Sequence, residues 1–592
     1  MKWLLAAILL FPTTALGVAQ EVCGNGIDDP GSTGGTPNGT WGSCPAGYMN
    51  AVTGNGCDLK CPGADQDNDG YTSNGQLGTA ASTAIDCDDT NKWIFPGKWT
   101  ASGCSAGQIR QCHATNGTYS ACVAESSVAR NTGSGTQYWI DCTNGNDANA
   151  GTYAAPFKTW GKVSGGSGAT GLPASPVTLA TGDSVGMKNT GSLTLCNTTI
   201  TSGGGQKAIG ILTSNGTTLN PITLFSYAPT SNFIYNNDGV GIDTAQHYRF
   251  EGLGFFTVAN TQNNGSSTRP GTDTIFESNY FAGMQGDGDN NDSCIYASHT
   301  NGVKIRRNVF IDCKRGKGNV TNISAIKWLD DDGSASECQD HEALWNGIVF
   351  SSLDSVNGGG CFYEKHGCTA TDVGANKHPV KWNSCTNGNF AFTWQGSSLR
   401  ADSNILISNT VSLGVGDGGE SPGQNDNQFT YNTVYGGELQ WRPSYTAPEK
   451  LTVSNNVFVD TRASYVGGNN EGIMSFGAYG SAGNKTTFET SPYYLSSNNN
   501  CFYNPNTALV FSYFNQGDSS GQFTFAQWKS RAVAYDAASY VENPLFDTFY
   551  QATSTNCSNK GRIYVAVTGG GTGATSLCPA HRFFFIDRKR RR

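Results

Sequence analysis

Six aspartates near the N-terminus form the sharpest local chemistry in this 592-residue sequence. They occur in Asp65-Gln66-Asp67-Asn68-Asp69-Gly70-Tyr71 and in Asp86-Cys87-Asp88-Asp89. Carboxylates at alternate positions before a glycine bend can converge on one cation, and Ca²⁺ accepts about six to eight oxygen ligands. We therefore expect Ca²⁺ as a cofactor, with these ligands: Asp65, Asp67, Asp69, Tyr71, Asp86, Asp88 and Asp89. The alternative is a solvated acidic turn, since short strings of this kind also arise by chance.

A second acidic cluster lies in the middle of the chain, in Asp330-Asp331-Asp332-Gly333. The same argument from oxygen ligands makes Asp330, Asp331 and Asp332 candidates for a second Ca²⁺ site. A solvated acidic loop explains this cluster equally well.

Acid and base groups follow in Tyr363-Glu364-Lys365-His366, which lies between Cys361 and Cys368. In a strand, alternation would place Tyr363 and Lys365 on one face and Glu364 and His366 on the other. Arg400 follows 35 residues after Lys365, and three candidate sugar contacts lie between them: His378, Lys381 and Trp382. The alternative is a surface lysine beside a packed histidine, both held between bridging cysteines.

The elements that must position these groups are predicted by a recurring phrase, in which Asn stands between two apolar pairs. It places Asn279, Asn308, Asn409, Asn432 and Asn456 at turns, and the last three are 23 and 24 residues apart. Short strands that repeat at such a period predict a solenoid, with Asn stacked on Asn and apolar residues stacked on apolar residues. The alternative is a β-sandwich, although sandwich turns recur at shorter spacing.

The composition supports an exported all-β protein. The chain has 77 Gly, only 14% charged residues, and enough aromatic residues (29 Phe, 24 Tyr and 12 Trp) for a core. Lys2, the apolar run 4–11 and the small residues 15–17 read as a signal peptide, which predicts a secreted, extracellular or cell-surface protein. No later apolar run approaches the roughly 18 residues needed to span a membrane. The 19 cysteines suit an oxidising compartment, and their odd number leaves at least one thiol free or paired between chains.

The cysteines also indicate a domain boundary, because eight of them fall between residues 23 and 122. Disulfides are the better explanation for an exported protein, although Cys57 and Cys61 could instead form a thiolate metal pair. The predicted division is a signal peptide at 1–20, a cysteine- and Asp-rich module at 21–125, a linker at 126–137, a solenoid at 138–555 and a tail at 556–592.

Residues 21–125 resemble an Asp-rich, Cys-containing repeat of exported bacterial proteins, which is named after a copper-binding surface protein of methane-oxidising bacteria. The resemblance rests on the Asp65–Tyr71 phrase, on Asp86-Cys87-Asp88-Asp89-Thr90-Asn91 and on Ile94-Phe95-Pro96-Gly97. Oxygen ligands suit Ca²⁺ better than copper, so the resemblance does not change the expected metal.

A second resemblance covers most of the remaining chain. Tyr138-Trp139-Ile140-Asp141 and Pro156-Phe157-Lys158-Thr159 are similar to the entry phrase of secreted right-handed parallel β-helix proteins, the pectate-lyase-like group. Asn543-Pro544-Leu545-Phe546 resembles the phrase that closes such helices. The resemblance implies an all-β fold, a right-handed parallel β-helix solenoid with a small N-terminal disulfide-rich calcium-binding module.

The phrase Lys365-His366-Gly367 resembles one found in several β-helix lyases, which implies eliminative cleavage of a uronate polymer. In that mechanism Ca²⁺ neutralises the substrate carboxylate, Lys365 is the base, and Arg400 or His366 assists. One solenoid fold hosts lyases, hydrolases and adhesins, so the fold alone does not decide the function.

The net charge of −9 argues against nucleic acid as a partner. The expected partner is an extracellular polysaccharide or cell-surface glycan, anionic if it is cleaved by elimination. The alternative function is a non-catalytic adhesin, matrix or fibre-forming protein, and self-association stays open in either case.

Overall fold

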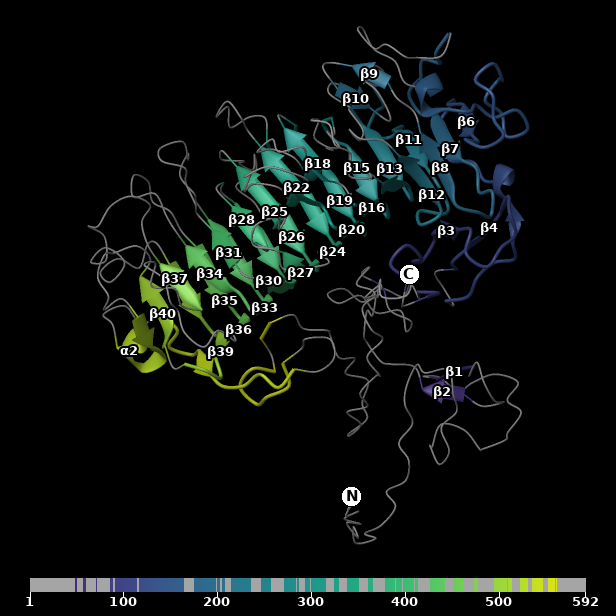
Figure 1. The fold of residues 1–592 in the computed structure, drawn as a ribbon. Coiled ribbons are helices and arrows are strands. Elements are labelled where there is room, and N and C mark those ends of the chain that lie inside the picture. Colours follow the sequence, from purple (N-terminus) through teal and green to yellow (C-terminus); the bar gives the residue numbers. More distant parts are fainter. Residues whose placement is uncertain are drawn as a thin grey trace, which may run out of the picture.

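The protein is described here from a computed structural model (Figure 1). The described residues are 48–50, 57–59, 71, 86–88, 91–113, 117–163, 175–197, 200–202, 205–207, 215–235, 246–256, 271–283, 285–286, 293–298, 300–315, 324–329, 338–350, 360–365, 378–388, 390–394, 396, 398–408, 410–413, 426–441, 451–460, 473–476, 495–507, 509–513, 522–530, 535–546, 552–558 and 560–561.

Three long sheets run side by side along the molecule, with 12, 12 and nine strands. The chain visits them in turn, so that each strand pairs with the strand one coil earlier and one coil later. All pairings within the three sheets are parallel except the last one of the third sheet, between β40 and β41. The predicted parallel β-helix is therefore confirmed.

The first sheet contains β6 (Gln137–Ile140), β7 (Ser184–Met187), β11 (Ile222–Phe225), β13 (Tyr248–Glu251), β15 (Ile275–Glu277), β19 (Lys304–Arg306), β23 (Glu342–Leu344), β26 (Pro379–Lys381), β29 (Arg400–Asp402), β32 (Asn427–Thr430), β35 (Leu451–Ser454) and β38 (Leu495–Asn498). The second contains β8 (Thr194–Asn197), β12 (Asn232–Tyr235), β14 (Gly254–Phe256), β16 (Tyr280–Ala282), β20 (Val309–Ile311), β24 (Gly347–Val349), β27 (Ser384–Gly388), β30 (Ile405–Ser408), β33 (Thr433–Tyr435), β36 (Val457–Val459), β39 (Cys501–Tyr503) and β42 (Tyr540–Val541). The third contains β18 (Ser293–Ser298), β22 (Ser324–Leu329), β25 (Gly360–Lys365), β28 (Phe392–Trp394), β31 (Thr410–Leu413), β34 (Glu438–Trp441), β37 (Met474–Phe476), β40 (Leu509–Tyr513) and β41 (Gln522–Thr524).

Shorter elements lie outside these sheets. They are β1 (Tyr48–Asn50), β2 (Cys57–Leu59), β3 (Trp99–Thr100), β4 (Gln108–Gln111), β5 (Val123–Ala124), β9 (Ile200–Ser202), β10 (Gly205–Lys207), β17 (Gln285–Gly286), β21 (Lys314–Arg315), the 3₁₀ helices Glu125–Ser127 and Trp160–Val163, and α2 (Phe525–Lys529). In Figure 1, β3 and β4 lie beside the first coils, and α2 lies at the opposite end of the solenoid. Among the described residues, no helix has both the length and the apolar character needed to cross a membrane.

A ladder of buried asparagines connects the coils at the turn from the first sheet to the second. Its members are Asn279, Asn308, Asn346, Asn383, Asn404, Asn432, Asn456 and Asn500, and all are completely buried. Each side-chain oxygen accepts hydrogen bonds from the backbone N–H and the amide of the preceding member, as between Asn346 and Asn383 (2.8 and 3.0 Å). The ladder satisfies turn N–H groups that the sheets cannot reach.

The ladder confirms the prediction for Asn279, Asn308, Asn432 and Asn456, while Asn409 lies outside the described residues. In that coil Asn404 occupies the ladder position instead. Steps along the ladder range from 21 to 44 residues, so the predicted period of 23 to 24 residues is not general. The variation lies in the segments before and after the third sheet, because the asparagine turn itself is only two residues long.

The interior is filled by like-on-like stacks, as the phrase predicted. Phe281 stacks on Phe255 and Phe310, each at 4.7 Å between ring centroids, and Phe458 stacks on Phe502 at 5.4 Å. One hydrophobic cluster runs from the first coil, at Ile140, to Tyr535 beside the last. Such stacks favour a single register, because a shift of one residue would turn every ring to the outside.

Disulfides tie several described segments, and no free cysteine occurs among the described residues. The pairs are Cys87–Cys112, Cys104–Cys122, Cys142–Cys196, Cys294–Cys313, Cys361–Cys385 and Cys501–Cys557. The predicted disulfides of the N-terminal segment are therefore present in its described part. Cys57 lies in β2, and the alternative of a metal pair with Cys61 falls on a residue outside the described ones.

Candidate functional site

The outer face of the third sheet belongs to strands that long segments of the chain precede and follow. From β15 to β39, the coils make a two-residue asparagine turn between the first and second sheets, whereas longer segments precede and follow strands such as β22 and β25. Irregular segments on a rigid scaffold are common places for binding and catalytic groups. This face therefore holds the first candidate site.

Lys327 is the central described group on that face. It pairs in register with Tyr296 of β18 and Tyr363 of β25, and its Nζ lies 5.8 Å and 4.6 Å from their ring centroids. The lysine is completely buried, and both tyrosines are nearly so. Lys365 ends the same strand as Tyr363 and pairs with Leu329, but its side chain is outside those described.

The other predicted catalytic groups are not brought to this face. Arg400 begins β29 in the first sheet, where its guanidinium bonds Asp426 at 2.8 Å, so it lies on a different side of the solenoid from Lys365. His366 lies outside the described residues. Counting residues could not show this separation, because the segments between sheets differ in length from coil to coil.

His378 also lies away from any surface. It is completely buried inside the solenoid together with His341, Trp328 and Trp394, with ring centroids 5.5 to 5.9 Å apart between neighbours. Burial, together with the neighbouring His378, holds the pKa of His341 well below its usual range, so this imidazole is neutral. The cluster is part of the core and cannot contact a polysaccharide directly.

A second candidate site lies on the outside of the asparagine turns. The residue before each ladder asparagine has left-handed backbone angles, and in three coils it is a large aromatic: Trp345 (φ 55°), Trp382 (φ 56°) and Tyr431 (φ 54°). We call these three residues the aromatic turn row. Trp345 and Trp382 are half-buried and stack at 4.8 Å, and Tyr431 is 36% exposed.

Charged groups border the row, and each named cation has a carboxylate partner. Lys381 pairs with Asp402 at 3.7 Å and lies 5.8 Å from the Trp382 ring centroid. Arg307, one coil before Trp345, stacks on that indole at 4.7 Å and bonds Glu277 at 3.1 Å. The row therefore presents aromatic surface in a setting of balanced charge.

The predicted Ca²⁺ ligands fall mostly outside the described residues: Asp65, Asp67, Asp69, Asp89, Asp330, Asp331 and Asp332. Of the others, Asp86 is nearly buried and accepts a bond from the Asp88 backbone N–H at 3.2 Å, and Tyr71 stacks on Phe95. Among the described residues, no three His, Cys, Asp or Glu side chains gather closely enough to hold a metal ion. The Ca²⁺ sites remain predictions.

The N-terminal segment is anchored to the solenoid by a buried ion cluster around Glu251 of β13. Lys98 approaches its carboxylate at 2.6 Å, Arg249 at 3.0 Å, and Arg130 also bonds it. Burial alone would raise the pKa of Glu251, but the three surrounding cations together hold it below its usual range. The segment also shares an apolar cluster with the first coils, which includes Ile109 and Phe225.

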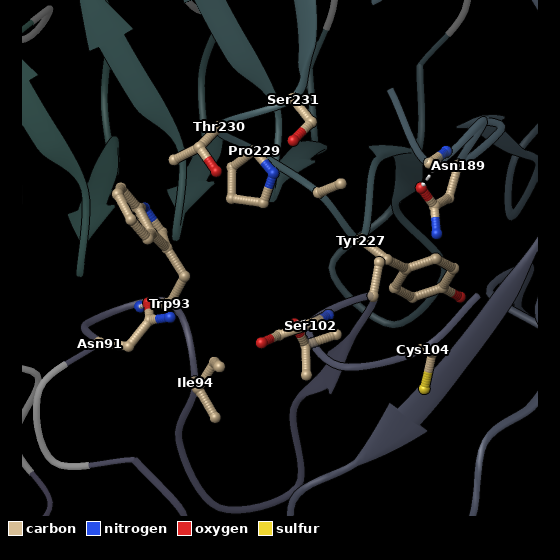
Figure 2. Close-up of a pocket in the computed structure, with 14 residues that line it drawn as sticks. Asn91, Trp93, Ile94, Ser102, Cys104, Asn189, Tyr227, Pro229, Thr230 and Ser231 are labelled. Carbon is tan, nitrogen blue, oxygen red and sulfur yellow. Dashed lines mark hydrogen bonds between the residues drawn. The ribbon is translucent and has the colours of Figure 1, made fainter. Parts of the chain in front are cut away.

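Beside this anchor lies a cleft of about 290 Å³ between the N-terminal segment and the first coils (Figure 2). Hydroxyl and amide side chains line it, and none of its described lining residues is charged. It therefore offers hydrogen bonds but no acid, base or metal ligand of its own.

Comparison with known proteins adds little to this description. No family model matches the chain, and no curated protein matches it. Among solved structures, the native GH136 lacto-N-biosidase from Eubacterium ramulus is 11% identical, covers 69% of this chain and 68% of its own, and has a TM-score of 0.36. The PL6 family alginate lyase AlyGC is 10% identical, covers 67% and 57%, and has a TM-score of 0.25. Likenesses at this level do not transfer a function.

The sequence singled out Trp382 and Lys381 but missed the row to which they belong. The missing signal is the position directly before each ladder asparagine, which carries Ser278, Arg307, Trp345, Trp382, Ser403 and Tyr431 in successive coils. This position becomes visible only when the coils are aligned on their ladder asparagines. Trp328, Trp394 and Trp441 are core residues and have no surface on which a sugar could stack.

Proposed function

We propose that the protein is an extracellular β-helix protein that binds a polysaccharide through the aromatic turn row. The observation that carries this proposal is the placement of Trp345, Trp382 and Tyr431 at left-handed positions on the outer surface. A bulky residue with positive φ is unusual, and the conformation costs roughly 1–2 kcal/mol relative to an ordinary backbone. Strain of this kind tends to persist where the residue serves a function.

The same turn position shows that the fold does not require aromatics there. Other coils place Ser278, Ser403, Asn455 or Asn499 at the corresponding angles. Asn is among the residues that adopt left-handed angles most readily, and Ser has a small side chain. Large rings at this position in three coils, two half-buried and one exposed, therefore serve something other than turn formation.

The row can present one indole face to a ligand. One face of Trp382 is covered by Trp345, but the next coil has only Ser403 at this position. Tyr431 stands in the coil after Ser403, two coils beyond Trp382. It therefore lies roughly 10 Å from Trp382 along the axis, because neighbouring strands are about 4.8 Å apart. A sugar ring can stack its apolar face on either aromatic while its hydroxyls reach Lys381 and Asp402.

Affinity gel electrophoresis against neutral and uronate polysaccharides tests this proposal. Trp382→Ser and Tyr431→Asn place residues that the turn accepts elsewhere, so both variants should fold. The loss of one stacking partner should weaken binding about tenfold, which corresponds to about 1.4 kcal/mol. Asn455→Ser, at the same turn position beyond the aromatics, is the matched control and should bind like the native protein. Equal retardation of all four proteins would overturn the proposal.

Cleavage by elimination is a second proposal, favoured by the position of Lys365 at the end of β25 in the third sheet. Lys327 and Lys365 both come from its strands, beside the insertions that would hold a substrate. Ca²⁺ at Asp330, Asp331 and Asp332 would neutralise a uronate carboxylate, and Lys365 in its neutral form would accept the adjacent proton. The electron pair left on carbon would form the double bond as the glycosidic C–O bond breaks, and water would protonate the leaving oxygen. Uronate polymers should then give unsaturated products by absorbance in the presence of Ca²⁺. Loss of activity in Lys365→Ala supports the role, whereas full activity removes it. Binding without any cleavage favours an adhesin or matrix protein.

The N-terminal Ca²⁺ site is a separate proposal. Titration calorimetry of the whole protein should show binding that Asp67→Ala and Asp69→Ala reduce. Heats unchanged by both substitutions would contradict it.

A further inference from the structure

We propose that the cleft between the N-terminal segment and the first coils binds a neutral sugar unit. This site is distinct from the aromatic turn row and does not rest on the function proposed above. Its volume of about 290 Å³ is close to the lower limit of roughly 300 Å³ for small-molecule pockets, which suits one ring rather than a large ligand.

The cleft has a buried floor and an open rim. Ile94, Thr100, Asn189 and Tyr227 form the floor and are all nearly or completely buried, whereas Ser102, Gly191 and Thr230 are exposed at the rim. Figure 2 shows Thr230 and Ser231 on one side of the cleft, with Asn91, Ile94 and Ser102 on the other. A ligand would therefore contact two segments that are far apart in the sequence.

The two walls are held in place by bonds of their own. The Ala101 N–H donates to the Tyr227 carbonyl at 3.0 Å, which joins the N-terminal segment to the coil. The Asn91 side chain accepts from the Trp93 N–H at 3.3 Å, and Thr100 accepts from the Ser102 N–H at 3.1 Å. A cleft whose walls are fixed before binding requires less ordering when a ligand enters.

The free hydrogen-bonding groups indicate the chemistry of the ligand. Within the described residues, the hydroxyls of Ser102, Thr230 and Ser231 make no hydrogen bond. Hydroxyls donate and accept, so they match the hydroxyls of a sugar. The half-buried Trp93 ring supplies apolar surface on which such a ring can rest.

The absence of charge in the lining selects against ionised ligands. The nearest cations of the segment are engaged elsewhere, since Lys92 donates to the Trp345 carbonyl at 2.8 Å and Lys98 pairs with Glu251. A carboxylate or phosphate in the cleft would lose hydration without gaining an opposite charge, which is unfavourable. The geometry thus favours a neutral hexose or N-acetylhexosamine over a uronate.

Saturation-transfer NMR on the full-length protein can test the proposal with methyl glycosides of glucose, galactose and N-acetylglucosamine, and with methyl glucuronide. At least one neutral glycoside should bind saturably and more tightly than the glucuronide. The double variant Thr230→Val with Ser231→Ala should weaken this binding about tenfold, because two hydrogen bonds are lost. Ser126→Ala, an exposed serine away from the cleft, is the control and should leave it unchanged.

Tighter binding of longer oligosaccharides would identify a glycan chain as the source of the sugar, and equal binding would identify a free sugar. Either result supports the site. Absence of saturable binding for every neutral glycoside, or equal binding by the double variant, would overturn it. So would tighter binding of the glucuronide. None of these results depends on Trp382 or Tyr431, so failure here is distinguishable from failure of the turn-row proposal.

Discussion

Replacement of one ladder asparagine, Asn383→Ala, should destabilise the coils around it strongly. The Asn383 oxygen accepts from the backbone N–H and the amide of Asn346, and its amide donates to the Ala343 carbonyl and to Asn404, all at 2.8 to 3.0 Å. Asn404 keeps one bond, from the backbone N–H of residue 383. Three buried groups therefore lose a partner, which at about 1 kcal/mol each gives a loss of about 3 kcal/mol.

Guanidinium denaturation followed by far-UV circular dichroism measures this loss, and hydrogen exchange of the Asn346 amide locates it. Asn144→Ala, at an exposed asparagine between β6 and β7, is the control and should change stability by no more than about 0.5 kcal/mol. A loss below about 1 kcal/mol for Asn383→Ala, or unchanged exchange at Asn346, would refute the reasoning that the ladder joins the coils.

Three other predictions concern buried titratable groups. His341 is neutral in the folded protein but protonates in the unfolded chain near pH 6.5, so the free energy of unfolding should fall as the pH drops below about 6.5, by up to about 1.4 kcal/mol per pH unit. His341→Gln should reduce that slope, which thermal melts at pH 5 and pH 7 measure. Glu251→Gln should leave Lys98 buried without its counter-charge and lower the free energy of unfolding by about 3 to 5 kcal/mol. Limited proteolysis of the N-terminal segment should then be faster than in the native protein, and an unchanged cleavage rate would count against the anchor. Asp536, which accepts bonds from Ser497, Ser539 and the Trp528 indole, closes the last coil, so Asp536→Ala should lower the melting temperature clearly more than a substitution of exposed Ser126.

The sequence was sufficient for the fold because the fold depends on short-range repetition. The Asn phrase marks a turn that recurs from coil to coil, and stacked phrases make each strand pair in parallel with the equivalent strand of the next coil. Asn346 and Asn383 are not predicted because long segments separate the ladder positions here, so these asparagines do not show the spacing of 23 to 24 residues. In the following coil the phrase points to Asn409, which lies five residues after the ladder asparagine Asn404.

The candidate sites were harder to predict because they combine residues from different coils. Which of these residues become neighbours depends on the number of residues in each coil, and this number varies. Lys365 and Arg400 are combined in the predicted mechanism although they are 35 residues apart, and they belong to different sheets. Conversely, Lys98 and Glu251 are separated by 153 residues and form a buried pair. Neither relation follows from motif spacing, because each insertion changes the length of its coil without changing the position of its strands.

The most direct test of the proposed function is to locate a bound polysaccharide by oxidative footprinting and mass spectrometry. The protein is first saturated with a polysaccharide that retards it in affinity gels. Protection is then measured at the half-buried or exposed aromatics Trp345, Trp382 and Tyr431, and at exposed Tyr540 as a reference. The proposal predicts strong protection of Trp382 and Tyr431 with Tyr540 unchanged. Protection elsewhere, with Trp382 and Tyr431 oxidised at the rate of the free protein, would contradict it.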